Sequence, residues 1–185
     1  NWDTPQTVTV TGVDDNIIDG TISSTITVSI DDANSDDNFD ALADQTVTAA
    51  TTDDDTAGFT IAETGGSTSV SESGTTDTFT IVLDAEPASN VVFNISSNDT
   101  GETTVTSSVT FTPGNWDTPQ TVTITGVDDD IIDGEQGSTI TITVDDANSD
   151  NDFDAVADQT VTATTTDDDT AGFTIVESGG STAVA

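Results

Sequence analysis

The sequence predicts an all-β protein built from antiparallel β-sandwiches, and three observations lead to this fold class. Apolar residues alternate with polar ones in one short segment after another, which is typical of strands with one buried face. About one residue in five is threonine, which favours strands and is a poor helix former. Turn-forming pairs such as Gly65-Gly66 and Pro113-Gly114 separate the segments.

Eight segments of the chain show the alternation in order. Within residues 120–127, for example, Val122 and Ile124 share one face of the expected strand, and threonines occupy the other face. The expected strands lie near residues 58–62, 68–72, 77–83, 91–97, 105–112, 120–127, 138–144 and 159–166. About seven antiparallel strands in about 100 residues is the size of an immunoglobulin-like sandwich. Its core should contain Phe79, Phe93, Phe111, Ile124 and Ile142.

The chain also repeats itself. Residues 1–71 return without a gap at 115–185, so that Asn1 reappears as Asn115, 114 positions later. A period of this length indicates a tandem array of whole domains. We therefore expect 1–57 to be the C-terminal half of one module, 58–169 a complete module, and 170–185 the start of the next. The connection between modules is short and should leave them little freedom.

The charge of the chain restricts its possible functions. There are 36 acidic residues and no Lys, Arg or His, so the formal net charge is -36 and internal salt bridges between side chains are excluded. Nucleic acids and anionic membrane surfaces attract basic proteins, so neither is an expected partner. Metal cations or very high salt are the expected sources of positive charge. Without His, Cys or Lys, a serine or threonine nucleophile has no ordinary base partner, and we expect no enzyme activity.

The acidic residues cluster where the expected strands end. The longest runs are Asp53-Asp54-Asp55, Asp128-Asp129-Asp130 and Asp167-Asp168-Asp169. Two carboxylates about 4 Å apart repel by about 4 kcal/mol at an effective dielectric constant of about 20, so converging clusters require a cation. Ca2+ accepts about six to eight oxygen ligands in loose geometry, and Asp-rich loops supply them. The lack of His and Cys argues against zinc, copper and iron.

Several motifs together resemble those of a Calx-beta domain. In chain order they are Val70-Ser-Glu-Ser-Gly74, Ser108-Val-Thr-Phe-Thr-Pro-Gly114, Val127-Asp-Asp-Asp-Ile-Ile-Asp-Gly134, Thr139-Ile-Thr-Ile-Thr-Val144 and Val161-Thr-Ala-Thr-Thr-Thr-Asp-Asp-Asp169. The resemblance extends over nearly all of one period. It implies a seven-stranded immunoglobulin-like sandwich with Ca2+ bound at one end.

The resemblance also implies a set of metal ligands. Glu72 is similar to the ligand glutamate that follows the first strands, and a further family acid falls near Asp99 and Glu102 without a clean match. The other matching acids of the complete module are Asp128, Asp129, Asp133, Asp167, Asp168 and Asp169. Their counterparts in the first copy are Asp14, Asp15, Asp19, Asp53, Asp54 and Asp55. The chain departs from the family at 134–138, where an acidic strand start is usual, so Glu135 is not an expected ligand.

Alternative interpretations of these residues stay open. The Asp runs are ordinary solvated turns if no ion binds them. The run 146–154 alternates Asp and Asn but lacks the glycine and the glutamate of an EF-hand, so it is a polar loop or a weaker second Ca2+ site. Trp116 either packs over the end of the sandwich or stacks on sugars.

We therefore expect a structural protein outside the cell: a Ca2+-stiffened extender region of a large secreted, adhesin-like or filament-forming surface protein. The setting follows from the Calx-beta resemblance. Expected partners are neighbouring repeats of the same chain, with lateral self-assembly or a cell-surface glycan in addition, and no membrane insertion is expected. The alternatives are a glycan- or protein-binding sandwich, and a surface-layer-type protein of a halophile with no specific role for Ca2+.

Overall fold

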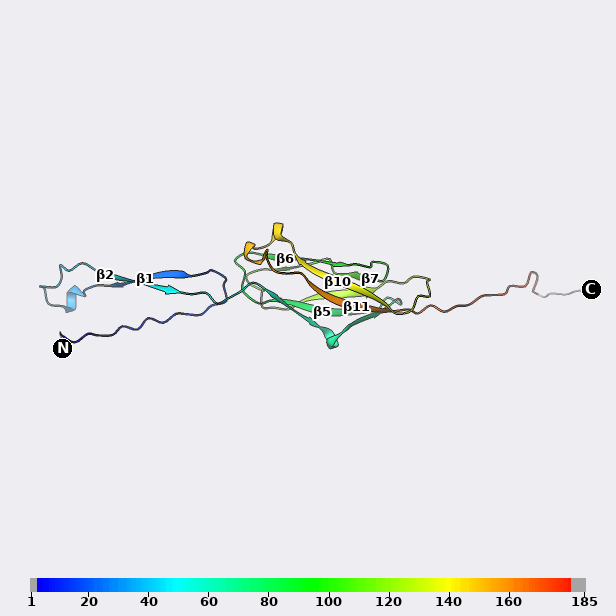
Figure 1. The fold of residues 1–185 in the computed structure, drawn as a ribbon, viewed down its shortest axis with the longest axis horizontal. Helices are drawn as coiled ribbons and strands as arrows, with labels where there is room; N and C mark the ends of the chain where they lie inside the picture. Colours follow the sequence, from blue (N-terminus) through cyan, green and yellow to red (C-terminus); the bar gives the residue numbers. More distant parts are fainter. Residues whose placement is uncertain (1–2, 181–185) are drawn as a thin grey trace, which may run out of the picture.

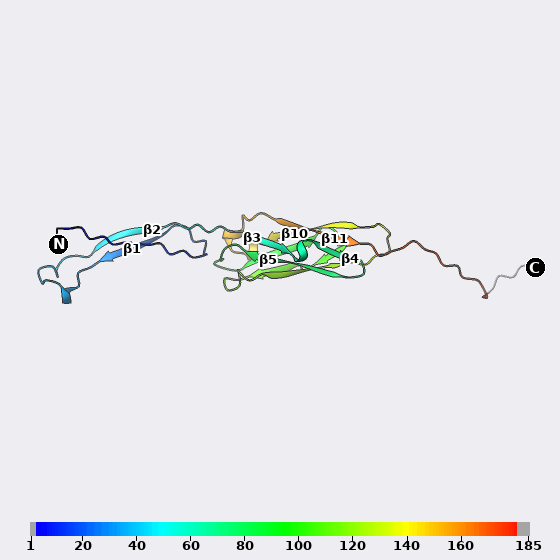
Figure 2. The same ribbon diagram turned by 90° about the horizontal axis from the view of Figure 1, so that it is seen from below.

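The computed structural model describes residues 3–180, and Figure 1 shows three parts that follow one another along the long axis. A two-stranded hairpin comes first, a β-sandwich lies in the middle, and an extended C-terminal segment follows. The turned view in Figure 2 shows the same order, so the molecule is elongated. The helices among the described residues are single 3₁₀ turns, and none of them has the length and apolar character that a membrane crossing needs.

The sandwich consists of nine strands in two sheets. One sheet has the order β4-β11-β10-β6-β8, and the other has the order β3-β5-β9-β7. Neighbouring strands are antiparallel, except that β4 runs parallel to β11. The strands are β3 (Phe59–Glu63), β4 (Thr68–Ser71), β5 (Thr76–Leu83), β6 (Val91–Ser97), β7 (Thr103–Val105), β8 (Ser108–Phe111), β9 (Gln120–Gly126), β10 (Gln136–Val144) and β11 (Gln159–Thr166). The predicted fold class, an all-β immunoglobulin-like sandwich, is confirmed.

One predicted strand, 105–112, is wrong as a single element. The chain forms two short strands there, and they belong to different sheets: Val105 pairs with Ile124 of β9, whereas Val109 pairs with Phe93 of β6. Thr106 makes the crossing, because its backbone N–H donates to the Thr123 carbonyl and its hydroxyl accepts from the Thr123 N–H. The apolar alternation continues through the crossing, so periodicity alone does not reveal it.

The predicted core residues all lie between the two sheets. They are Phe79, Phe93, Phe111, Ile124 and Ile142, and each has an exposed fraction of 0%. The Phe93 ring packs edge-on against Phe111, with ring centroids 6.0 Å apart, and also contacts Phe59 at 4.7 Å. Burying each phenylalanine contributes about 1.5–3 kcal/mol to folding, so these rings supply much of the stability of a chain without crosslinks. Phe153 is also fully buried, although it comes from a loop that the sequence predicts to be polar.

That loop, which follows β10, contains the 3₁₀ turns η3 (Asp146–Asn148) and η4 (Asn151–Phe153). The carboxylate of Asp150 is buried and accepts hydrogen bonds from the Ser89 N–H at 2.7 Å, the Ser89 hydroxyl and the Asp152 N–H. These donors account for both oxygens of Asp150. The loop therefore serves to cover the core with Phe153, and this arrangement favours the polar-loop interpretation over a second ion site.

The N-terminal hairpin reproduces part of the sandwich. Strand β1 (Ile22–Val28), the turn η1 (Asp32–Asn34) and strand β2 (Gln45–Thr51) correspond to β10, η3 and β11 one period later. The register is also the same, since Ile22 faces Thr51 as Gln136 faces Thr165. The segment 6–12 repeats β9 in sequence but is not a strand. In the sandwich, β9 pairs with β5 and β7.

Candidate metal centre

One end of the sandwich collects carboxylates from four different segments. Glu72 follows β4, and Asp167 and Asp169 follow β11; because β4 and β11 are parallel neighbours, their C-terminal ends meet. Asp133 lies in the loop between β9 and β10, at the same end, since β10 is antiparallel to β11. Glu102 comes just before β7, whose first residue pairs with the last residue of β9. We call this set (Glu72, Glu102, Asp133, Asp167 and Asp169) the acidic pole.

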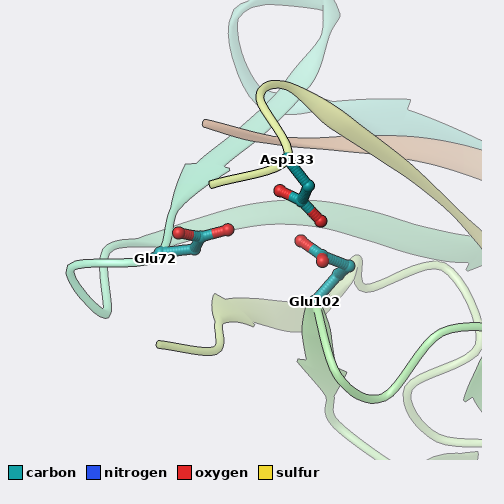
Figure 3. Close-up of side chains that lie close together, drawn as sticks. All are labelled: Glu72, Glu102 and Asp133. Carbon is teal, nitrogen blue, oxygen red and sulfur yellow. The ribbon is translucent and has the colours of Figure 1, made fainter. Parts of the chain in front are cut away.

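The carboxylates of the acidic pole form two groups that share Glu72. One group is Glu72, Glu102 and Asp133, and the other is Glu72, Asp167 and Asp169; within each group one oxygen per residue lies within 4.8 Å of the others. Figure 3 shows Glu72, Glu102 and Asp133 extending from separate segments toward a common space. Five acids from four segments therefore face one small volume, and no basic side chain exists in the chain to balance them.

Burial makes this arrangement unfavourable in the absence of a cation. Glu72 is only 1% exposed, and neither of its carboxylate oxygens has a hydrogen-bond partner. Glu102 is 7% exposed, and its Oε2 lacks a partner, as does Oδ2 of Asp169. Buried polar groups in folded proteins are normally hydrogen-bonded, and buried charges are paired or coordinate metals. These unpartnered oxygens are therefore suited to contact a positive group.

The pKa values of three residues in the acidic pole are raised by burial and by neighbouring carboxylates. Burial raises the pKa of Glu72 above its usual value. The N–H of Asp168, which does not meet hydrogen-bond geometry with either oxygen of Glu72, opposes the rise, and the carboxylates of Asp167, Asp129 and Glu102 add to it. Burial likewise raises the pKa of Glu102, with Asp133 as its strongest charged neighbour. The pKa of Asp169 is raised first by burial and then by the surrounding aspartates.

The pKa of Asp167 shifts in the opposite direction, and this residue joins the loop after β9 to the segment after β11. Its carboxylate accepts hydrogen bonds from the backbone N–H of Gly134 at 2.8 Å and of Asp169 at 2.7 Å. These bonds lower the pKa of Asp167, so it stays ionised and ties the loop after β9 to the end of β11. The first copy repeats this frame, because Asp53 accepts from the N–H groups of Asp19, Gly20 and Asp55.

Backbone packing positions Glu72. Its N–H donates to the Thr166 carbonyl at 3.1 Å, which fixes the chain after β4 to the end of β11. Gly126 at the end of β9 lies against this segment, and a β-carbon built there would stand 2.8 Å from the carbonyl carbon of Ser71. Sequence reasoning missed Gly126, although a glycine at the end of an otherwise regular strand is a signal of close backbone approach.

The remaining predicted ligands of the complete module lie around the acidic pole but outside its two groups. Asp128 and Asp168 line a shallow hollow together with Glu72. Asp129 accepts a hydrogen bond from the Ile131 N–H at 2.6 Å, and Asp99 accepts one from the Gly101 N–H at 3.1 Å, so each stabilises its own turn. For Trp116 the sequence left two interpretations, packing over the sandwich end and stacking on sugars. Its side chain is half-buried and packs against the core.

The first-copy acids are also close together. Asp14, Asp15, Asp19, Asp53, Asp54 and Asp55 all line one open hollow beside the hairpin. Within residues 3–180, however, no three of these carboxylates come as near to one another as those of the acidic pole. The chain contains no first-copy counterparts of Glu72 and Glu102, which are the buried members of the complete set.

The donor set of the acidic pole fits a hard cation. The ligand atoms of its two groups are all carboxylate oxygens, contributed by four separate segments of the chain. Oxygen-only sites suit Ca2+ and Mg2+, and several loop carboxylates in loose geometry suit Ca2+ better, because Mg2+ requires a near-ideal octahedron and retains water. The residues present therefore fit the Ca2+ that the family resemblance implies.

Comparisons with known proteins add a likeness in fold. No protein-family model and no curated protein matches the chain. Among solved structures, the apo form of the Calx CBD1 domain has a TM-score of 0.43 and 16% identity, over 60% of this chain and 98% of that one. Domains 1-6 of the surface layer protein SbsC have a TM-score of 0.40 and 25% identity, over 66% of this chain and 15% of that one. The E. coli chaperone DraB has a TM-score of 0.44 and 8% identity, over 62% of this chain and 59% of that one. All three TM-scores are below 0.5, so the fold class rests on the two packed sheets described above.

Proposed function

We propose that the acidic pole binds Ca2+ and that the protein is a stiff extender region of a large extracellular surface protein. The observation that carries the proposal is Glu72, a carboxylate that is 1% exposed and has no hydrogen-bond partner on either oxygen. A buried charge without a partner destabilises the fold, and a cation converts the same charge into a ligand. The other four carboxylates of the acidic pole lie close enough to Glu72 to act as further ligands.

Stiffening follows from where the ligands lie. Asp133 belongs to the loop after β9, while Asp167 and Asp169 lead directly into the segment that leaves the sandwich. An ion held between them fixes the exit direction of the chain relative to the sheets. Because the acidic pole is assembled in the folded state, Ca2+ bound there stabilises that state by at most RT ln(1 + [Ca]/Kd), about 2.7 kcal/mol at a hundredfold excess over Kd.

The repeat supports a mechanical role for this site. Near-identical copies in tandem suit a string of spacers, since each copy contributes the same length and the same metal response. An exterior location provides the millimolar Ca2+ that a site of moderate affinity needs. The adhesin-like or filament-forming context and any lateral self-assembly belong to the same proposal.

Titration calorimetry tests the metal site directly. The metal-stripped chain is titrated with CaCl2, with MgCl2, and with KCl at the same ionic strength, and the melting temperature is recorded for each. We expect saturable heat and a higher melting temperature with Ca2+ at millimolar concentration. Equal stabilisation by KCl would reject the specific site and favour adaptation to high salt.

A matched pair of variants locates the binding. Glu72→Gln removes the buried charge with little change of shape, and Glu177→Gln makes the same chemical change in the exposed C-terminal segment. The first variant should abolish or greatly weaken the Ca2+ heat, and the second should leave it unchanged. Similar titrations for both variants would show that Ca2+ responds to overall charge and not to the acidic pole.

A further inference from the structure

The loop between β9 and β10 carries two isoleucines that the metal site does not use. Ile131 and Ile132 are 60% and 56% exposed, and they lie between the ligand candidates Asp129 and Asp133. Within residues 58–171 these two are the large hydrophobic side chains that stand exposed. The first copy has the same residues at Ile17 and Ile18, followed by the same Asp-Gly pair.

The first-copy isoleucines are not free, because they contact the sandwich. Ile17 forms a parallel β-bridge with Glu86, in the turn between β5 and β6. The Glu86 N–H donates a hydrogen bond of 2.7 Å to the Asn16 carbonyl. Ile18 is half-buried and packs against the hydrophobic core of the sandwich. Ile17 is 36% exposed, against 60% for its counterpart Ile131.

We propose that Ile131 and Ile132 form a docking surface for the turn between β5 and β6 of a following copy of the sandwich. The occupant is specified by the contact already present in the chain, where the identical Ile-Ile pair meets that turn. The polar part of the contact is made by backbone atoms, so the replacement of Asn16 by Asp130 in the second copy does not remove it. The docking goes beyond the proposed metal function and stands whether or not the acidic pole binds Ca2+.

The contact is suited to setting direction as well as to burying apolar surface. A parallel bridge and a short hydrogen bond fix the backbone of the loop against the turn, while the isoleucine fills the space beside it. The residues that flank Glu86, Ala85 and Pro87, are both buried, so the turn is a firm support. Copies joined in this way are arranged head to tail, a heterologous contact that extends a chain of modules without closing it.

Hydrogen exchange at the Glu86 amide tests the contact in the 185-residue chain. Ile18→Ser should accelerate the exchange of that amide by about tenfold, as expected when part of an isoleucine burial is lost from the docked state. Ile132→Ser is the matched control. It makes the same change at the counterpart of Ile18 in the second copy, which does not contact the Glu86 turn in the 185-residue chain. Unchanged exchange in Ile18→Ser, or an equal acceleration in Ile132→Ser, would overturn the proposal.

A longer chain tests the surface itself. One further copy of residues 72–171 is added after Ala185, which supplies the turn that Ile131 and Ile132 lack. In this chain Ile132→Ser should accelerate exchange at the added counterpart of Glu86 by about tenfold and leave Glu86 itself unaffected. No change at the added amide would reject the docking surface. Calcium calorimetry on the same variant should still show saturable Ca2+ heat, so failure of the docking is distinguishable from failure of the metal site.

Discussion

Under the proposed function, Glu72 has two opposite effects on stability, and the presence of a cation determines which is larger. Without a cation the buried charge lacks both solvent and a partner, and its neighbours are also acidic. With a cation the same burial excludes water from the site and strengthens the attraction between ion and ligand. A neutral replacement of equal shape therefore separates the two effects.

We predict that Glu72→Gln reverses its effect on stability with Ca2+. The metal-stripped variant should melt at a higher temperature than the unsubstituted chain, because a buried charge has been removed. In millimolar Ca2+ it should melt at a lower temperature, because a ligand has been lost. Scanning calorimetry of both proteins, with Glu177→Gln as control, measures the four values. A variant that melts lower under both conditions would contradict the role assigned to Glu72.

The pKa shifts give a second prediction at this scale. The folded-state pKa values of Glu72 and Glu102 are raised above the ordinary value of 4.5. In the pH range between 4.5 and these raised values, the folded metal-free protein therefore binds more protons than the unfolded chain does. Stability is then greatest near and below the unfolded value and is lost as pH rises through the folded pKa. Asp167 has a lowered pKa and contributes in the opposite sense, losing its stabilisation only as pH falls below 3.8.

The metal-stripped chain should consequently be more stable near pH 4.5 than at neutral pH, and saturating Ca2+ should remove or reverse this difference. Thermal melting at the two pH values, with and without Ca2+, measures the effect. Protonation at low pH also relieves the general repulsion between acids, which raises stability in the same direction. The contribution of the acidic pole is therefore the part of the pH-dependent stability change that is lost in Glu72→Gln. A metal-stripped chain that becomes steadily more stable from pH 4.5 to neutrality would exclude this account.

At the scale of the element, the end of β9 connects packing to the metal site. Gly126 lies against the Ser71 backbone, one residue before Glu72, so any side chain there moves the segment that carries Glu72. We predict that Gly126→Ala destabilises the sandwich by about 1–3 kcal/mol, as overpacking generally does, and weakens Ca2+ binding. Gly137→Ala is the control, since a β-carbon at that position in β10 meets nothing within 4 Å. Chemical unfolding and calorimetry compare the two variants, and equal effects would show that Gly126 has no special role.

The elements also show how far the sequence leads. Strict alternation in β5, β6, β9 and β10 was enough to predict the strands and the residues between the sheets, because each strand has one buried face. Alternation did not reveal the crossing between β7 and β8, since both strands continue the same pattern in different sheets. Phe153 was missed because its burial depends on a loop held by Asp150 and Ser89, which are 61 positions apart in the chain.

The acidic pole was predictable in part for the same reason. The Asp runs are visible in the sequence, but which carboxylates meet depends on the parallel pairing of β4 with β11 and on β7 beside β9. Glu102 illustrates the difference. It is a single glutamate in a loop, without a motif, and only the position of β7 brings it to Glu72 and Asp133. Whether all of the acids around the pole act as ligands stays a prediction.

At the scale of the whole molecule, the proposed metal site and the proposed docking surface share one loop. The loop after β9 carries Asp129 and Asp133 together with Ile131 and Ile132, and Asp167 anchors it through Gly134. An ion bound at the acidic pole would restrict the loop that is proposed to dock on the next copy. Metal binding within one module is thus expected to be transmitted to the angle between modules, through a contiguous loop and without any change in the sheets.

We therefore predict that Ca2+ narrows the distribution of angles between modules in the chain extended by one copy of residues 72–171. Spin labels on the two sandwiches report this distribution as distances, and small-angle scattering reports the maximum dimension. With Ca2+ the distances should become longer and more uniform, and chelation should broaden them. Glu72→Gln should broaden them even with Ca2+, whereas Glu177→Gln should not. A distribution that stays equally narrow without Ca2+ would mean that the isoleucine contact alone stiffens the array. A distance distribution that is broad under all conditions would contradict the proposed stiffening role.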